Sequence, residues 1–575
     1  MKPPLKKLTL LLTLLPALTL TVSAAHVVNT GTVTESGAQY GSEYPDQRVL
    51  RVTGVGTKYD GTNILLSSTS SGTFAGVYAS GIITESGATA TLHSSTIVQT
   101  VSGGLGAYLS DGSRLTLDRV RIITDGVSGV GANGGYLAAG DLTVEAPAGN
   151  GIVFWQTGTA TLERVDITAL QRGVSISNTA ALIASDLKIR TTGTTNGALF
   201  LLNSATAGVC RALIETEGDS AIAVWVQQYS TLNLVSGTLR TSGSNGNGIY
   251  AMSGCGITLG DTAIETQGDA AHGLDILSGA TIVTGSDVRI EVSGSGAWGA
   301  RIVDGQVELE NSSITASGSN GGGVSVTGTG ALLLNNTDIH AETGRAITTG
   351  SLAVAELNLD GNTITGDLTA ADDSVLTVTG SNGTVINGDL TVSGTAAINL
   401  TLSGSDSTLL GDITQNDNTA AVTVTISDGA TGSGGYTGGN LITGEDSTWT
   451  FNKNSHGNYG ENDGTWNIGD YEVIFDNMTH TGTVNISVNS DTGEGGSITV
   501  TGTADGAGTV HIDTTGDGKA DPNKVLPGIV SGDGTENWQW DPIDWGIDTI
   551  IKDGDHFIKQ GTSPAGAVLN SSVAI

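Results

Sequence analysis

The triplet Gly218-Asp219-Ser220 is the first place in this sequence where catalytic chemistry can be sought. A serine nucleophile needs a nearby base and an acid that orients the base. The histidines that precede the triplet are His26 and His93, and both belong to distant parts of the chain. The triplet alone therefore does not indicate a serine hydrolase.

A second copy of the same phrase decides between a nucleophile and a turn. The stretch IETEGDSAIAV, which begins at Ile214, aligns without a gap with IETQGDAAHGL, which begins at Ile264. The alignment places Ala270 at the position of Ser220. Gly followed by Asp suits a tight turn. We therefore predict that Ser220 is a turn residue at the corner that follows a strand.

Carboxylates are the next candidates, because polysaccharide-cleaving enzymes use pairs of them. Asp372 and Asp373 are adjacent, and adjacent strand residues point to opposite faces, so they could share a site only in a turn. The segment Ala-Asp-Asp-Ser favours a turn. Asp219 and Asp269 lie two sequence repeats apart, roughly 10 Å in a stack of strands, which is near the carboxylate separation of inverting glycosidases. His272 is the one base beside them.

No metal, cofactor or catalytic residue is predicted. The segment DTTGDGKAD, Asp513 to Asp521, has Asp at the first, fifth and ninth positions and Gly at the sixth, as in a calcium loop. Its third position is Thr, and its twelfth is Lys524 where a bidentate Glu is needed. This pattern favours a polar hairpin, and calcium binding near Asp513 stays open.

Composition excludes several classes of protein. The formal net charge is −34, and such a surface repels the phosphates of nucleic acids. The acidic residues are interpreted mainly as a solvated, solubilising surface. The two cysteines, Cys210 and Cys255, cannot make a disulfide scaffold. Free thiols are favoured over a bond, because residues two repeats apart in a stack lie roughly 10 Å apart.

Residues 1–25 resemble a secretory signal peptide. Lys2, Lys6 and Lys7 precede an apolar run, LTLLLTLLPALTLTV, and VSAA supplies small residues for cleavage after Ala24 or Ala25. The mature chain is therefore expected to be exported.

A repeat of about 25 residues is the strongest feature of the sequence. Short apolar phrases recur with steps of 22–26 residues. Their central residues are Ile97, Ile122, Val144, Ile167, Ile189, Ile214, Leu239, Ile264, Ile290, Ile314, Ile339 and Ile364. The phrase GDL or GDI continues the series from Gly366, Gly388 and Gly411.

Each repeat contains about three short strands that alternate in polarity and end at Gly, Asn or Thr. From Gly323, for example, GVSVTG, ALLLNN and DIHAETG follow one another. Three strands in 25 residues, without helical periodicity, predict one coil of a right-handed, single-stranded parallel β-helix of the pectin-lyase-like class. We assign this solenoid to residues 26–445.

The composition changes near residue 445. Five of the eight tryptophans lie beyond it, at Trp449, Trp466, Trp538, Trp540 and Trp545. A solenoid must cover its last open edge. Residues 446–562 are therefore predicted to be a C-terminal β capping region, and residues 563–575, which contain an early Pro, are predicted to begin a helix.

The whole pattern resembles the passenger of an autotransporter of type V secretion, and pertactin-like passengers in particular. The phrases that carry the resemblance are VDITALQRGVSISNTAALIASDLKI from Val165, YEVIFDNMTHTGTVNISVN from Tyr471, GSITVTGTADGAGTVHID, and SPAGAVLNSSVAI at the end of the chain. The second and third resemble the segment that caps such passengers and assists their folding. The last resembles the start of the linker helix that precedes a membrane barrel, which would follow residue 575.

The resemblance implies a monomeric, non-enzymatic protein at the bacterial surface or outer membrane, or released from it. Its expected role is that of an adhesin or virulence-associated interaction protein, and its expected partners are a host-cell surface, matrix protein or glycan and its own translocator barrel. No Arg-Gly-Asp and no proline-rich loop marks a ligand-binding segment. A polysaccharide-cleaving lyase or glycosidase is the alternative.

Overall fold

The computed structural model describes residues 26–42, 48–68, 80–100, 103–110, 112–489, 494–515, 530–540, 543–544, 548–553 and 556–561. The predicted signal peptide and linker helix lie outside these residues. The chain divides into two compact units. The first contains residues up to Ile249 together with Cys255–Ile257, and the second contains Tyr250–Gly254 and the residues from Thr258 onward. Strands β25 (Ile249–Met252) and β26 (Gly256–Gly260) contain residues of both units.

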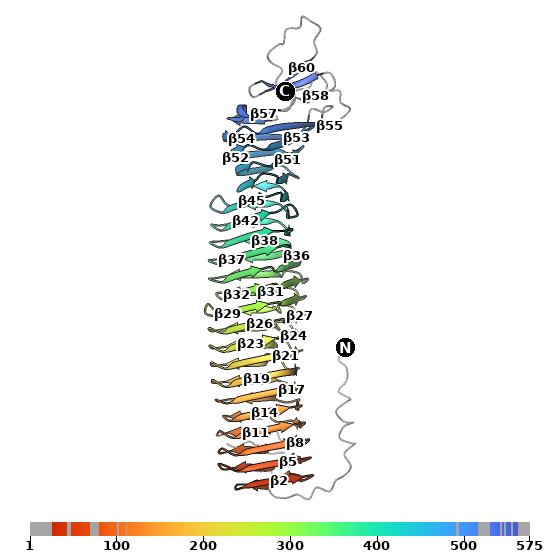
Figure 1. The fold of residues 1–575 in the computed structure, drawn as a ribbon, viewed down its shortest axis with the longest axis vertical. Helices are drawn as coiled ribbons and strands as arrows, with labels where there is room; N and C mark the ends of the chain where they lie inside the picture. The colour runs from red at the N-terminus through yellow and green to blue at the C-terminus, as the bar shows by residue number, and fades with distance from the viewer. Residues whose placement is uncertain are drawn as a thin grey trace. The chain divides into compact units, whose positions relative to one another are not determined.

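The first unit is a stack of parallel coils with three sheets (Figure 1). The first sheet consists of β1 (His26–Val28), β4 (Leu50–Thr53), β7 (Ser80–Glu85), β10 (Leu105–Ser110), β13 (Ser128–Asn133), β16 (Asn150–Phe154), β18 (Val174–Ser177), β20 (Gly197–Leu202) and β22 (Ile222–Gln227). The second consists of β2 (Thr32–Ser36), β5 (Lys58–Thr62), β8 (Thr89–His93), β11 (Arg114–Asp118), β14 (Tyr136–Gly140), the first halves of β17 (Thr159–Ala169), β19 (Ala181–Thr191) and β21 (Thr206–Thr216), and β23 (Thr231–Val235). The third consists of β3 (Gln39–Ser42), β6 (Leu65–Ser68), β9 (Thr96–Gln99), β12 (Arg121–Thr124), β15 (Thr143–Ala146), the second halves of β17, β19 and β21, and β24 (Thr238–Thr241).

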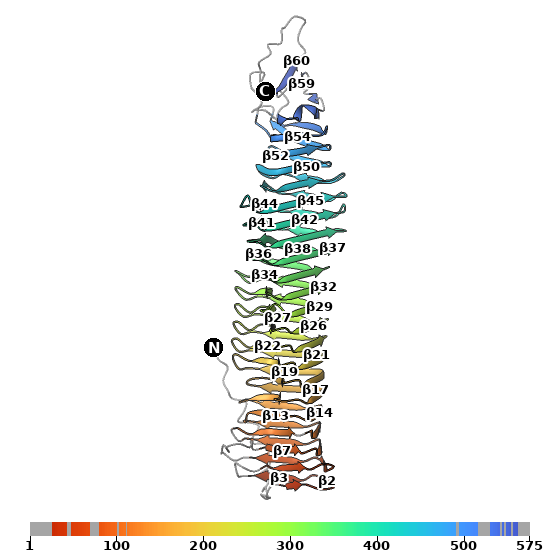
Figure 2. The same cartoon turned by 90° about the vertical axis from the view of Figure 1, so that its left-hand side faces the viewer.

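The second unit repeats this design, and Figure 2 shows its stacked strands from the side. Its earlier strands are β27 (Ala263–Thr266), β28 (Leu274–Ile276), β29 (Ile282–Ser286), β30 (Arg289–Val292), β31 (Trp298–Val303), β32 (Gln306–Glu310), β33 (Ser313–Ala316), β34 (Gly322–Thr327), β35 (Ala331–Asn335), β36 (Asp338–Thr349), β37 (Val354–Asp360), β38 (Thr363–Ala370), β39 (Val375–Ser381), β40 (Val385–Asn387), β41 (Leu390–Val392), β42 (Ala397–Ser403), β43 (Thr408–Leu410), β44 (Ile413–Gln415) and β45 (Ala421–Ser427). Its later strands are β46 (Thr431–Ser433), β47 (Tyr436–Thr437), β48 (Asn440–Thr443), β49 (Thr448–Thr450), β50 (Ser455–Asn462), β51 (Thr465–Gly469), β52 (Glu472–His480), β53 (Thr483–Asn489), β54 (Ser497–Asp505), β55 (Thr509–Thr515), β56 (Val530–Asp533) and β57 (Gln539–Trp540).

The predicted period is confirmed by strand register. In the first unit the phrase residues pair in the order Ile97, Ile122, Val144, Ile167, Ile189, Ile214 and Leu239. In the second they pair in the order Ile264, Ile290, Ile314, Ile339 and Ile364, and Ile364 pairs in turn with Ile386. All are buried. Each coil leaves its inward side chains open to the next coil, so stacking buries a continuous apolar column. The prediction of an all-β parallel solenoid is therefore confirmed.

The interior of the second unit becomes aromatic toward its C-terminal end. Gly432, Trp449 and Trp466 pair in register, and the step between them falls to 17 residues. Gly432 leaves room for the Trp449 ring, which a Cβ at this position would meet. Tyr436, Trp449, Trp466 and Phe475 are completely buried. Bulky rings therefore fill the interior of these shorter coils.

Parallel pairing continues through the described strands from β49 to β57 and ends with the pairing of β55 with β57. Strands β58 (Ile543–Asp544), β59 (Asp548–Asp553) and β60 (His556–Gly561) then form an antiparallel sheet. The one helical element in the described part of the chain is a 3-10 turn, Thr535–Asn537. No described helix has the length and apolar character of a membrane span. The capping role of residues 446–562 stays a proposal.

Candidate interaction surface

The corner at Ser220 is a turn, as predicted. Ser220 has φ +55° and its N–H donates to the carbonyl of Ser244 over 2.7 Å. Ala270 has φ +51° and donates to the carbonyl of Ser295 over 2.8 Å. The two residues thus have the same left-handed conformation and the same bond to a following coil. The role of residue 220 in the turn therefore comes from its backbone conformation and backbone hydrogen bond, and not from the Ser220 hydroxyl.

The histidines considered as partners of Ser220 have other contacts. His93 Nδ1 lies 3.2 Å from Asp118 Oδ2, and His93 Nε2 lies 3.8 Å from Asp60 Oδ1. His26 stacks on Tyr40 with ring centroids 4.7 Å apart, and its Nε2 lies 3.6 Å from Glu35. His93 thus contacts two carboxylates of its own, second sheet, and His26, on β1 of the first sheet, contacts one residue of the second sheet and one of the third.

The candidate carboxylates hold neighbouring coils together. Asp219 accepts a hydrogen bond from the N–H of Ser244 at 3.1 Å, and Asp269 accepts one from the N–H of Ser295 at 3.0 Å. Each oxygen therefore satisfies a backbone donor that the corner would otherwise leave without a partner. This is a structural use of the carboxylates that were considered for glycoside chemistry.

Asp372 and Asp373 form a turn, as the sequence indicates. Asp372 has φ +59°, and its carboxylate accepts from the N–H of Ser351 at 3.3 Å. Asp373 accepts from the hydroxyl of Thr395. Both residues are exposed. Each carboxylate binds a separate neighbouring coil, so the pair is not aimed at one common point.

A buried polar cluster that the sequence analysis missed surrounds His272. Asp275 is 1% exposed and accepts two hydrogen bonds from Arg301, with Oδ1–Nε 2.8 Å and Oδ2–Nη2 2.9 Å. His272 Nδ1 accepts from the N–H of Trp298 at 3.1 Å. Burial lowers the pKa of His272 to about 4, so the ring is neutral at pH 7. The one-coil register between Asp275 and Arg301 is the signal that could have found the pair.

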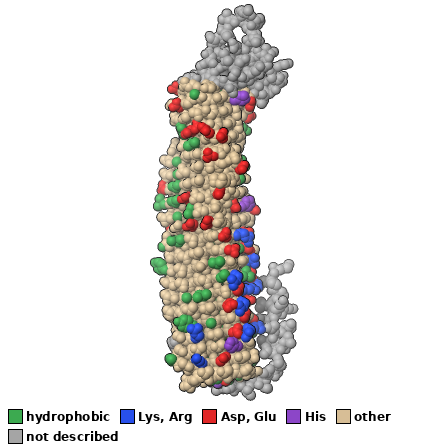
Figure 3. Space-filling model, in the orientation of Figure 1, with side chains coloured by type: hydrophobic (Ala, Val, Ile, Leu, Met, Phe, Trp, Pro, Cys, Tyr) green, Lys and Arg blue, Asp and Glu red, His purple; other side chains and the backbone are tan. Residues whose placement is uncertain are grey.

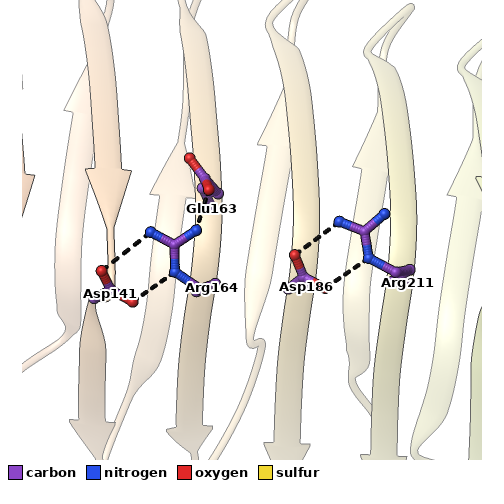
Figure 4. A network of polar contacts seen from close by, with 5 residues as sticks. All are labelled: Asp141, Glu163, Arg164, Asp186 and Arg211. Carbon is purple, nitrogen blue, oxygen red and sulfur yellow. Dashed lines mark hydrogen bonds and ion pairs between the residues drawn. The ribbon is translucent and has the colours of Figure 1, made fainter.

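An exposed ladder of charges follows one left-handed corner of the first unit (Figure 4). Arg119, Asp141, Arg164, Asp186 and Arg211 occupy it in successive coils, all with φ between 50° and 53°. Arg164 holds Asp141 through bonds of 2.7 and 3.1 Å, and Arg211 holds Asp186 through bonds of 2.7 and 2.8 Å. These arginine hydrogen bonds lower the pKa of Asp141 and of Asp186.

The ladder belongs to a wider band of paired charges. Arg190 donates to Glu217 over 2.9 Å, and Arg121 donates to Glu145 over 2.9 Å. On the face drawn in Figure 3, Lys and Arg side chains gather along one edge and are interleaved with Asp and Glu. The coil spacing of about 4.8 Å sets the distance between neighbouring members. The solenoid therefore displays charges at a regular spacing.

Neither Cys210 nor Cys255 forms a disulfide. Cys255 is buried, and Cys210 is half-buried beside the exposed Arg211.

Among the residues that the structure describes, no group of three or more His, Cys, Asp and Glu side chains is placed to hold a metal. Asp513 is the first residue of the candidate calcium segment, and its Oδ1 lies 3.2 Å from Nε2 of His511. Residues 516–521 of that segment lie outside the described residues.

Comparisons with known proteins give likenesses to solved structures. No family model and no curated protein matches the chain. A chain in the cryo-EM structure of the Vag8–C1 inhibitor complex is similar over 86% of this chain and 100% of its own length, with 15% identity and a TM-score of 0.35. Because this TM-score is low, the fold rests on the strand pairing described above, and the role of the surface rests on its geometry. The parallel solenoid is the fold that the resemblance to autotransporter passengers implied.

Proposed function

We propose that this chain is an exported, pertactin-like autotransporter passenger that acts as an adhesin or related interaction protein at the bacterial surface. Its partner would be a host-cell surface, a matrix protein or a glycan, bound along the outer face of the coils. The signal-peptide pattern of residues 1–25 and the acidic surface support an exported, monomeric protein. The folding of residues 446–562 outside the cell as a cap belongs to the same proposal.

The observation that carries the proposal is the regular display of exposed side chains on a filled interior. Arg119, Asp141, Arg164, Asp186 and Arg211 are presented one coil apart, while the inward residues of the same coils are buried. A repetitive partner can contact several coils at once, and many weak contacts then add to a useful affinity. An extended surface of this kind supports binding better than catalysis.

The hydrogen bonds of the candidate carboxylates argue against the enzymatic alternative. Asp219, Asp269 and Asp372 each accept from the backbone N–H of a neighbouring coil. A general acid or base must instead reach the proton that it transfers. A polysaccharide-cleaving activity would therefore need residues other than these.

Exposing the purified, exported chain to an array of polysaccharides and matrix proteins tests the proposal. Both retention on the array and the chain length of each polysaccharide are measured. Retention of unshortened ligand is the expected result. Shortened polysaccharide would overturn the proposal in favour of the lyase or glycosidase, and retention of nothing on the array would count against an adhesin.

A further inference from the structure

The outer face of the first sheet in the first unit is aromatic, unlike the charged outer face of the third sheet. Its outward residues Val153, Ser175, Phe200 and Trp225 pair in register in β16, β18, β20 and β22. The corresponding outward row of the third sheet is Thr168, Arg190, Glu215 and Arg240. Val153, Ser175 and Phe200 are nevertheless buried, so most of this row is covered, and Trp225 is its one half-buried member.

Arg172 crosses this row. Its guanidinium carbon lies 3.9 Å from the centroid of the Phe200 ring, and Nη1 lies 3.4 Å from the hydroxyl of Ser175. The side chain is half-buried, and burial lowers the pKa of Arg172. No carboxylate of the described residues pairs with Arg172, whereas Arg164, Arg190 and Arg211 each hold one. Within the described residues, Arg172 is thus a half-buried positive charge that no carboxylate neutralises.

Two further rings extend the surface around Arg172. Trp225 meets Phe200 edge to face, with centroids 5.4 Å apart. Trp155 lies over Gly131, where a Cβ would meet its ring. Both tryptophans are half-buried. We call Trp155, Arg172, Ser175, Phe200 and Trp225 the aromatic–arginine face.

The strand pairing around this face decides which ligand suits it. β18 pairs with β16 and β20, and β20 pairs with β18 and β22. Because both edges of these strands are occupied, a peptide cannot add to them as a further strand. What remains for a ligand is the ring surface of the two half-buried tryptophans and the half-buried guanidinium of Arg172, which suit the apolar face and the carboxylate of a sugar. The net charge of −34 opposes a densely charged polyanion and favours a glycan with widely spaced carboxylates.

We propose that the aromatic–arginine face binds the carboxylate-bearing sugar of an acidic glycan, with the carboxylate on Arg172 and the sugar ring against Trp225. This site names the ligand class for the binding role proposed above and rests on that role. The carboxylate supplies the counter-charge that Arg172 lacks in the described chain. The guanidinium is held in place by Phe200 and Ser175 before the ligand arrives, so little ordering is needed on binding.

Binding of hyaluronan oligosaccharides to the full exported chain tests the site. Their affinity is compared with that of the same oligosaccharides after reduction of the carboxylates to alcohols. The variants are Arg172→Gln, Trp225→Leu and the matched control Arg345→Gln, which removes one exposed positive charge from the second unit. Arg172→Gln and Trp225→Leu are expected to weaken binding about tenfold or more, as is reduction of the carboxylates, while Arg345→Gln keeps the affinity. Thermal unfolding of each variant shows that the fold is intact.

Equal affinity of Arg172→Gln and the unchanged chain for the acidic oligosaccharide would overturn the site. Binding that depends on Arg172 but prefers an acidic peptide would overturn the assignment to glycans. If the chain is retained by another ligand on the array and Arg172→Gln has no effect on that retention, the site fails while the proposed function stands. If the chain is retained by no ligand of either experiment, the proposed function fails as well.

Discussion

At the scale of single residues, the corners depend on glycine because the coils lie so close together. A Cβ on Gly218 would lie under 3.0 Å from the carbonyl oxygen of Gly193, and a Cβ on Gly243 would lie under 3.0 Å from that of Gly218, both much closer than van der Waals contact. In the second unit Gly294 and Gly318 have the same relation to Gly268 and Gly294. The column of glycines is therefore a packing requirement of the stack and not a sign of flexibility.

Replacing one corner glycine tests this requirement. Gly218→Ala is expected to destabilise the chain by about 2 kcal/mol, because the coils must separate to admit the methyl group. Gly208→Ala is the matched control, since nothing lies within 4 Å of a Cβ at Gly208. Denaturant unfolding of the two variants gives the comparison. Equal stability of both variants would show that the corner can relax without cost.

A second residue-scale prediction concerns pH. His480 is completely buried, with Asn462 3.3 Å from Nδ1 and the carbonyl of Thr509 3.3 Å from Nε2. Burial lowers the pKa of His480 to about 4 from an ordinary value of 6.5. Between these values the unfolded chain binds the extra proton and the folded chain does not. The contribution of His480 to the free energy of unfolding is therefore fully present above about pH 6.5. As the pH falls toward 4, this contribution decreases by roughly 3 kcal/mol.

Unfolding measured at pH 7.5 and pH 4.5 checks the prediction. His480→Gln should reduce the difference in stability between the two pH values, whatever it does to stability at pH 7.5. His456→Gln is the control, because His456 is exposed beside Asp476 at 3.2 Å. His272 contributes in the same direction through its own lowered pKa. An unchanged pH dependence in His480→Gln would contradict the assignment.

At the scale of elements, the shorter coils near the C-terminal end depend on ring packing. Trp466 stacks on Phe475 with centroids 5.1 Å apart and meets Phe451 edge to face at 5.7 Å. Its Nε1 donates to the hydroxyl of Thr443 at 2.8 Å. The ring therefore joins β51 to the coils on both sides by apolar contact and by one hydrogen bond.

Removal of this ring should be among the most costly single changes. Trp466→Ala is expected to destabilise the chain by about 4 kcal/mol, through lost burial and a cavity, and it also leaves the Thr443 hydroxyl without its donor. Trp466→Phe retains most of the ring and should cost clearly less. Thermal unfolding distinguishes them, and a small effect of Trp466→Ala would show that the neighbouring rings can collapse into the space.

At the scale of the whole molecule, folding of a parallel solenoid is slow because every strand pairs with a strand about one coil away in sequence. An exported chain would stay unfolded, and so able to pass through a narrow secretion pore, until one end of the stack had folded stably. The aromatic coils and the strands that follow them are the candidate for that end, so residues 446–562 are proposed to start the stacking outside the cell.

Deletion of residues 446–562 tests this role. The exported remainder is expected to stay sensitive to protease, because the last coil then exposes unpaired strand edges and apolar interior. Trp466→Ala should give an intermediate sensitivity, and Gly208→Ala should give none. Full protease resistance of the deleted chain would contradict a folding role for this region.

The order of residues alone was enough to predict the coil, its period and its inward ladder from Ile97 to Ile364, because burial on one face demands an apolar residue at the same point of every repeat. It was also enough to identify Ser220 and Asp372 as turn residues, since local turn chemistry decides them. The counter-charge of Asp275, the ring beneath Arg172 and the partners of His480 were decided only by the tertiary structure. Each depends on which residue of the next coil stands opposite, and coils that vary between 17 and 32 residues change that register from one turn to the next.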